Sequence, residues 1–275
     1  MKKRIVSLML AAALLTGAAS AAGEEGAAEQ PDLDLSAASA VLMEKETGAL
    51  LYEKESHQQL EPASVTKVMT LLLIMEDLDS GRLSKEDLVT VSAAAAGMGG
   101  SQVYLKEGEQ LSAGELIKCI AVVSGNDAAV AMAEHLAGSE AAFVERMNRR
   151  AQELGMKDTV FVNCTGLPAA GHHSSAYDIA LMSRELILHH PDIRTYTTIW
   201  MDSIRDGAFG LTNTNRLVRF YPGATGLKTG STDSALYCLS ATAERDGMEL
   251  IAVVMKAPSS AHRFDDAKAL LDYGF

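Results

Sequence analysis

The sequence has few cysteines and none of the residue spacings that are typical of zinc sites. It contains 3 cysteines in 275 residues, with no Cys-x-x-Cys pair and no His-Glu-x-x-His motif. The histidine pairs at 172–173 and 189–190 have no carboxylates nearby in a ligand-like spacing. We therefore predict that the protein binds no metal ion and needs no cofactor.

The cysteines are odd in number, so they cannot all pair within one chain. Cys119 lies in an apolar run over 116–123, and Cys238 lies in another over 235–239. A cysteine in such surroundings behaves as a small apolar residue. We therefore predict that Cys119, Cys164 and Cys238 are buried thiols.

Positive charge is also scarce. The chain has 24 Lys and Arg residues against 36 Asp and Glu residues, which gives a net charge of −12. Three of the positive residues, Lys2, Lys3 and Arg4, precede an uncharged stretch over 5–22 that carries an Ala-Ser-Ala cleavage pattern, as in a signal peptide. An uncleaved membrane anchor is the alternative, although the second half of the stretch is poorly apolar.

Cleavage after residue 22 removes those 3 positive charges and changes the net charge from −12 to −15. A surface this acidic disfavours nucleic acid and anionic membranes as partners. The sequence therefore predicts an exported, extracytoplasmic protein that binds no nucleic acid.

An apolar fraction of 48% and a charged fraction of 22% are typical of a globular protein. We predict a signal peptide over 1–22, a linker over 23–35 and one folded domain over 36–275. Strands are expected at 38–44, 49–53, 236–243 and 249–256, and helices at 62–81, 112–136, 139–154, 175–189 and 263–272. This order predicts an α+β fold, with an antiparallel sheet built from the N- and C-terminal segments, flanked by helices, and an inserted all-helical subdomain at about 80–190.

The motif Ser64-Val65-Thr66-Lys67 lies at the start of a strongly apolar predicted helix. Residues three apart on a helix share a face, with Cβ atoms about 5–6 Å apart, so the Lys67 amine can reach the Ser64 hydroxyl. Burial beside apolar neighbours and near a second lysine would lower the pKa of Lys67, and a neutral amine can accept the serine proton. An isolated Ser-x-x-Lys is usually a helix cap with a solvated lysine, but a lone charge on an apolar helix needs another explanation.

Two further polar motifs follow in the chain. Ser124-Gly125-Asn126 ends an apolar run, and its glycine allows the hydroxyl and the carboxamide to point the same way. In Lys228-Thr229-Gly230 the amine and hydroxyl can bind a carboxylate, while the missing Cβ lets a ligand backbone lie against the strand. A helix-to-helix turn and an edge-strand lysine are the structural alternatives. Together and in this order, the three motifs predict a serine acyl-transfer site that uses lysine as its base.

The three motifs resemble those of β-lactamases and penicillin-binding proteins. With Ser-Gly-Asn as the second motif, the chain is most similar to the low-molecular-mass serine D-alanyl-D-alanine carboxypeptidases of the peptidase S11 family. The resemblance runs over 36–275 and includes the blocks 161–168, 173–178 and 263–275. It implies a β-lactamase/DD-peptidase-like fold and an enzyme that removes the terminal D-alanine from peptidoglycan stem pentapeptides. Many relatives continue into a β-rich domain and an anchor helix, so membrane association stays undecided.

The resemblance also implies a role for each motif residue. Ser64 attacks the carbonyl between two terminal D-alanines, Lys67 takes its proton, and Ser124 relays a proton to the departing D-alanine. The backbone N–H groups of Ser64 and Ser231 form the oxyanion hole. The implied substrate-binding residues are Asn126, Lys228, Thr229, Gly230 and Ser231, with Lys228 and Thr229 on the terminal carboxylate. β-Lactams, which mimic the dipeptide, are expected to acylate Ser64 and to leave slowly.

Asp178 follows Ser175 by three residues, which indicates a capping carboxylate, and a role near the deacylating water is the alternative.

A class A β-lactamase would need a Glu-x-x-Leu-Asn type of loop, and the sequence between the second and third motifs has none. A D,D-endopeptidase of the same family and a non-catalytic β-lactam sensor domain stay open as alternatives.

Overall fold

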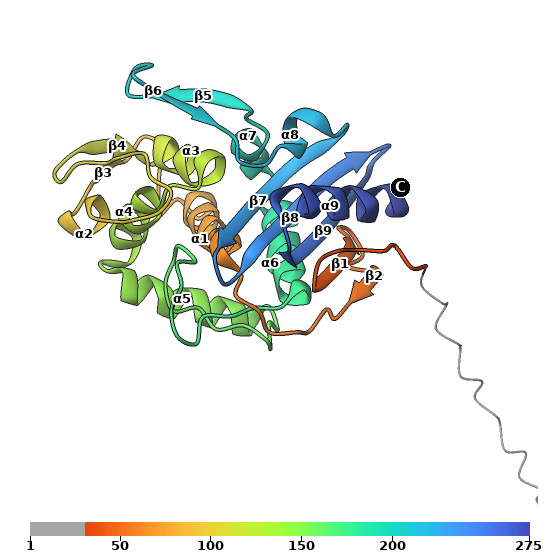
Figure 1. Cartoon of the computed structure of the whole chain (residues 1–275). Coiled ribbons are helices and arrows are strands. Elements are labelled where there is room, and N and C mark those ends of the chain that lie inside the picture. The colour runs from red at the N-terminus through yellow and green to blue at the C-terminus, as the bar shows by residue number, and fades with distance from the viewer. Residues whose placement is uncertain (1–30) are drawn as a thin grey trace, which may run out of the picture. The chain divides into compact units, whose positions relative to one another are not determined.

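A five-stranded antiparallel sheet unites the two ends of the chain in this computed structural model, which describes residues 31–275 (Figure 1). Its strands lie in the order β2–β1–β9–β8–β7. They are β1 (Ser39–Glu44), β2 (Leu50–Lys54), β7 (Ala224–Thr232), β8 (Leu236–Arg245) and β9 (Met248–Ala257). The predicted α+β fold is therefore confirmed. The predicted signal peptide and most of the predicted linker lie outside the described residues.

Both faces of the sheet are buried. Val41 of β1 pairs with Val253 of β9, and both belong to one apolar cluster. Their neighbours Leu42 and Ala252 also pair, and both belong to a second cluster on the opposite face. Because successive strand residues point to opposite faces, a strand buried on both sides is apolar at nearly every position.

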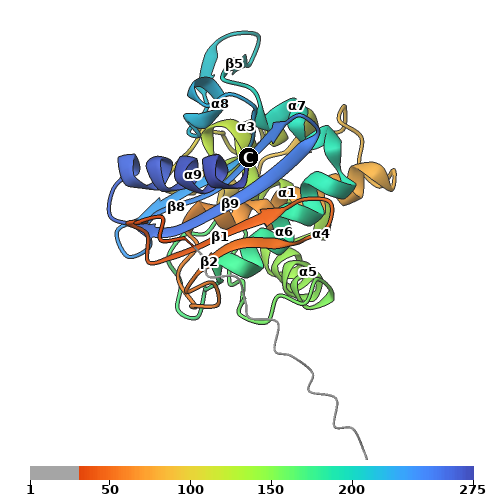
Figure 2. The same cartoon turned by 90° about the vertical axis from the view of Figure 1, so that its right-hand side faces the viewer.

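Helices cover the two faces (Figures 1 and 2). Helix α9 (Ser260–Gly274) packs against β8 and β9 on one face. Helices α1 (Lys67–Asp79) and α6 (Ala176–His189) pack together, and α6 contacts β9 and β1 on the other face. The side chains over 67–75 of α1 are all buried, as the sequence predicts for a central helix.

The middle of the chain lies beside the sheet (Figure 1). It contains α2 (Ala93–Ala96), α3 (Ala113–Val123), α4 (Asn126–Ala137), α5 (Glu140–Glu153) and the ribbon of β3 (Leu88–Thr90) and β4 (Gln110–Ser112). A hairpin of β5 (Met201–Ile204) and β6 (Phe209–Thr212) lies in sequence between short helices α7 (Arg194–Thr197) and α8 (Leu217–Phe220). All belong to one compact unit, Asp32–Phe275, and the boundaries of a helical subdomain stay a prediction.

The helix predicted over 112–136 is wrong as a single element, because the structure divides it into α3 and α4. Ser124 ends α3 with a left-handed φ of 64°, and Gly125 then caps α4. A residue in the left-handed region cannot continue a right-handed helix. A capping box of Ser112 and Glu115 begins α3. Across the described residues, no helix combines the length and apolarity needed to cross a membrane.

Candidate active site

Ser64 and Lys67 lie at the junction of two helical segments. The 3₁₀ turn η1 (Ala63–Thr66) carries Ser64 and runs directly into α1, which begins at Lys67. Lys67 Nζ lies 3.0 Å from Ser64 Oγ. The sequence predicts an α-helical first turn here, and the structure has a tighter one. In a 3₁₀ turn, residues i and i+3 eclipse each other, so the pair still shares a face.

The amine of Lys67 is fully buried and bonded on three sides. Besides Ser64 Oγ, it donates to Asn126 Oδ1 at 2.6 Å and to Thr165 O at 2.7 Å. Burial lowers the pKa of Lys67 to about 7, while the Asp127 carboxylate acts in the opposite direction. A large fraction of Lys67 is therefore a neutral amine near pH 7, and that form can accept a proton from Ser64.

The second motif contacts the first directly. Asn126 begins α4, and its carboxamide accepts from Lys67 and donates to Gly99 O at 2.7 Å. Ser124 Oγ is buried and has no hydrogen-bond partner among residues 31–275. Because buried hydroxyl groups are nearly always paired, an unpaired one indicates a functional role or an additional partner.

The third motif lies on β7, at the edge of the sheet. Lys228 is nevertheless only 1% exposed, and its Nζ donates to Thr229 O at 2.9 Å. Burial, with the nearby charges of Lys67 and Arg263, holds the pKa of Lys228 well below its ordinary value. Thr229 Oγ1 lies 2.7 Å from Thr214 Oγ1. A solvated edge-strand lysine is therefore not what the structure contains.

Gly230 of the same strand lies against the turn that carries Ser64. A Cβ atom on Gly230 would lie 2.8 Å from Ser64 N and 2.9 Å from both Pro62 O and Val65 N. The missing Cβ therefore makes room for η1. That it also lets a ligand backbone lie against β7 stays a prediction. The strand β7 contacts η1, and Ser231 follows Gly230 directly on this strand.

A loop over 162–166 supplies a group that sequence reasoning missed. Its Thr165 carbonyl accepts from Lys67, and Thr70 Oγ1 donates to Cys164 O at 2.7 Å. Within the loop, Asn163 Oδ1 accepts from Gly166 N at 2.7 Å. The contribution of Thr165 is a backbone carbonyl, for which the amino-acid type gives no signal.

Two more missed residues hold the motifs in place. Asp127 is fully buried, and its carboxylate accepts from Val103 N at 3.0 Å and Leu105 N at 3.1 Å. These bonds fix the segment beside Asn126. Arg263 of α9 donates to Gly230 O at 3.1 Å and so ties this helix to the third motif. For Asp127, the sequence did offer a signal, because this carboxylate directly follows the second motif.

Asp178 is engaged in a different group of contacts. Its N–H donates to Ser175 Oγ at 3.2 Å, so the Ser175 hydroxyl caps α6. The prediction that the Asp178 carboxylate is a capping group is wrong, because this carboxylate bonds to another segment. Its carboxylate accepts from Asp158 N at 2.8 Å and Thr159 Oγ1 at 2.7 Å, and burial raises its pKa. These bonds tie residues 158–159 to α6, while a role in deacylation stays a prediction.

All three cysteines are free and buried, as predicted. Burial raises the pKa of Cys119 to about 12 and that of Cys238 to about 11. Over residues 31–275, no three side chains of His, Cys, Asp or Glu gather into an arrangement that could hold a metal ion.

The sequence profile of the D-alanyl-D-alanine carboxypeptidase family, peptidase S11, matches residues 24–259. The D-alanyl-D-alanine carboxypeptidase DacF of Bacillus subtilis is 48% identical over 278 residues, which cover 100% of this chain and 71% of DacF. DacD of Escherichia coli is 40% identical over 250 residues, which cover 88% of this chain and 63% of DacD.

Solved structures have the same fold. Penicillin binding protein 6B from Escherichia coli superposes with a TM-score of 0.83 and 39% identity, covering 90% of this chain and 79% of that one. Penicillin-Binding Protein D2 from Listeria monocytogenes, in its ampicillin bound form, gives a TM-score of 0.82 and 34% identity, covering 89% of this chain and 100% of that one.

Proposed function

The chain belongs to the D-alanyl-D-alanine carboxypeptidase family, peptidase S11, and on that basis we propose that it removes the terminal D-alanine from peptidoglycan stem pentapeptides through an acyl-enzyme on Ser64. The observation that carries this proposal is the 3.0 Å hydrogen bond between Lys67 Nζ and Ser64 Oγ. Burial lowers the pKa of this amine to about 7, so the serine has beside it the base that its activation requires.

Acylation begins when neutral Lys67 takes the proton of the Ser64 hydroxyl. Ser64 Oγ then forms a bond to the carbonyl carbon between the two D-alanines. We assign the oxyanion to the backbone N–H groups of Ser64 and Ser231. The contact of Gly230 with Ser64 N supports this assignment, because Ser231 follows Gly230 directly. Removing one such donor typically costs about 10²–10³ in rate.

The tetrahedral adduct collapses when the bond to the terminal D-alanine nitrogen breaks, and that nitrogen leaves with a proton. We assign the proton relay to Ser124, supported by its buried hydroxyl without a partner in the described part of the chain. We assign the peptide group of the substrate to Asn126. One N–H of its carboxamide goes to Gly99 O, which leaves the other for the substrate.

The terminal carboxylate of the substrate is assigned to Lys228 and Thr229. Lys228 lies buried in the site with its pKa held low, so its charge is costly in the free protein. A carboxylate arriving within about 4–6 Å favours the ammonium form again. The site therefore has a reason to prefer peptides with a free C-terminal carboxylate.

Water completes the cycle by attacking the ester, and Ser64 Oγ leaves and regains its proton. Lys67 is the base in contact with Ser64 Oγ, so we assign it to this step as well. Asp178 is less well placed, since its carboxylate bonds go to Asp158 and Thr159. β-Lactams are proposed to acylate Ser64 by the same first step. The ampicillin bound form of the Listeria relative supports this proposal.

The substrate class locates the proposed reaction outside the cytoplasm, in the cell envelope. The signal-peptide pattern over 1–22 supports export, although it lies outside the described residues. The net charge of −12 supports the proposal that nucleic acid is not a partner.

The test is D-alanine release from a pentapeptide ending in D-Ala-D-Ala. We expect Ser64→Ala to lower the rate by about 10⁴ or more. Ser234→Ala, at an exposed serine near the end of β7, is the matched control and is expected to keep the wild-type rate. Equal release by the wild type and Ser64→Ala would refute the proposal.

The same protein separates the alternatives. A D,D-endopeptidase would open dimeric muropeptides without releasing D-alanine from the pentapeptide. A class A β-lactamase would hydrolyse benzylpenicillin with rapid multiple turnover. A sensor domain would bind penicillin covalently and release no D-alanine.

A further inference from the structure

His172 is a buried histidine that the proposed catalytic cycle does not use. It is 4% exposed and lies between the turn η1 and the start of the loop over 162–166. Its Nε2 lies 2.8 Å from Thr66 Oγ1. Its Nδ1 accepts a hydrogen bond from Val162 N at 3.0 Å. One imidazole therefore joins two segments that are about a hundred residues apart in sequence.

These two contacts determine the tautomer of His172. Nδ1 accepts from a backbone N–H and so carries no hydrogen, which leaves the hydrogen of the neutral ring on Nε2 for donation to Thr66 Oγ1. Burial and the neighbouring His173 lower the pKa of His172 to about 4, while Glu61 acts in the opposite direction. The ring is thus neutral over the pH range in which Lys67 titrates, and both bonds persist there.

The two segments that His172 joins both lead to Lys67. Thr66 directly precedes Lys67 in the chain, and Val162 leads into the loop whose Thr165 carbonyl accepts from the Lys67 amine. The loop fits tightly on η1, since a Cβ atom on Gly166 would lie 2.8 Å from Thr66 Oγ1. A small displacement of the loop would therefore open the enclosure around the amine.

We propose that His172 is a positioning residue for acylation, which holds the loop over 162–166 on η1 and thereby keeps the Thr165 carbonyl in place and the Lys67 amine buried. This proposal rests on the proposed function of Ser64 and Lys67. The enclosure matters because burial is the main cause of the lowered pKa of Lys67. Of the titratable groups that face this amine, Cys164 and Asp127 act against the lowering of its pKa, and the charge of Lys67 in turn lowers the pKa of Lys228.

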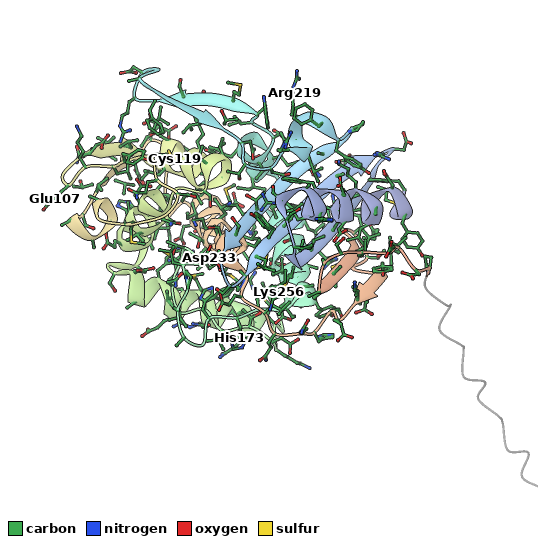
Figure 3. All side chains as sticks on the ribbon, in the orientation of Figure 1. Glu107, Cys119, His173, Arg219, Asp233 and Lys256 are labelled. Atoms are coloured by element: carbon green, nitrogen blue, oxygen red, sulfur yellow. The ribbon has the colours of Figure 1, made fainter. Side chains whose placement is uncertain are left out.

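The test uses variants of one position and a neighbouring control. His172→Leu removes both bonds. His172→Gln keeps an acceptor for Val162 N and a donor for Thr66 Oγ1 but does not titrate. His172→Asn is shorter and cannot span both partners. His173→Gln is the control, because the His173 ring bonds to Gly171 O and not to η1. Figure 3 labels His173 on the loop at the lower edge of the view.

The measurement is the single-turnover rate constant for acylation by a fluorescent penicillin, on both sides of the Lys67 pKa of about 7. A rate constant of this kind does not depend on the fraction of active protein. We expect His172→Leu to acylate about 10²-fold more slowly at pH 7, since misplacement of about 1 Å near a reacting group costs that much. We also expect its pH midpoint to move from about 7 toward 10.5, because water then reaches the Lys67 amine.

His172→Gln and the control are expected to keep the wild-type midpoint, and His172→Asn to fall between the Gln and Leu variants. A purely structural role would lower the yield of folded protein and leave the midpoint of the folded fraction unchanged. An unchanged midpoint in His172→Leu, or in His172→Asn if the Leu variant does not fold, would overturn the inference. A shifted midpoint in His172→Gln would do the same. Failure of the wild type to be labelled would instead count against the proposed function.

Discussion

The backbone of Gly230 lies so close to that of Ser64 that a Cβ atom at position 230 would stand 2.8 Å from the Ser64 nitrogen. This nitrogen is one of the two assigned to the oxyanion. The edge strand β7 and the turn η1 therefore pack closely against each other, and their spacing depends on the absence of a side chain at position 230.

Gly230→Ala is expected to slow acylation of Ser64 by about 10²–10³, because the added Cβ forces β7 and η1 apart and misplaces an oxyanion donor. The measurement is single-turnover labelling with a fluorescent penicillin. Gly210→Ala in β6 is the matched control, since a Cβ there meets nothing within 4 Å. Equal labelling rates in the two variants would show that acylation does not depend on the close approach of Gly230 to Ser64.

The acylation rate of the wild type is expected to rise with pH, with a midpoint near the Lys67 pKa of about 7. Below this pH the amine is protonated and has no lone pair to accept the Ser64 proton. Lys67→Arg keeps the positive charge at every accessible pH and is expected to lose about 10³ or more in rate. The test is the pH profile of labelling, with circular dichroism to confirm the fold. A pH-independent wild-type rate would argue against Lys67 as the base.

Asp127→Ala is expected to destabilise the protein by about 3 kcal/mol, because it removes a buried acceptor and leaves the N–H groups of Val103 and Leu105 unpaired. The measurement is the free energy of unfolding from urea denaturation. Asp265→Ala is the control. It removes an exposed ion pair with Lys268, which is worth about 0–1 kcal/mol. Similar losses in both variants would show that Asp127 holds nothing in place.

Asp178→Ala is expected to lower stability by about 1–3 kcal/mol, since it leaves Asp158 N without its acceptor. The decay rate of the acyl-enzyme on Ser64 is expected to stay unchanged, because the carboxylate contacts residues 158–159. Mass spectrometry of the penicillin adduct over time provides the measurement. A strongly slowed decay in folded protein would return Asp178 to the deacylation step.

The thiols are expected to be inert in the folded protein. Burial and raised pKa values leave little thiolate on Cys119, which Figure 3 labels, or on Cys238. A thiol reagent should therefore titrate no cysteine under native conditions and all 3 after denaturation. Rapid reaction of one thiol in the native protein would show that its burial is incomplete.

Local patterns in the sequence were sufficient for most of the architecture. Alternating and continuous apolar runs identified β1, β2, β8 and β9, and the apolar helix after Ser64 was correctly predicted as buried. The ribbon of β3 and β4 and the hairpin of β5 and β6 were not predicted. Their strands have only three or four residues, which is too short for a period to be recognised.

The sequence by itself determined which chemical groups this protein has, because residue type fixes the hydroxyl of Ser64 and the amines of Lys67 and Lys228. Only the tertiary structure decided how they meet. Three features depend on contacts between distant segments. Thr165 O accepts a hydrogen bond from Lys67, Gly230 packs against the turn of Ser64, and the bonds of His172 select its tautomer. The low pKa of Lys67 likewise comes from burial, which is a property of the packed molecule and of no single motif.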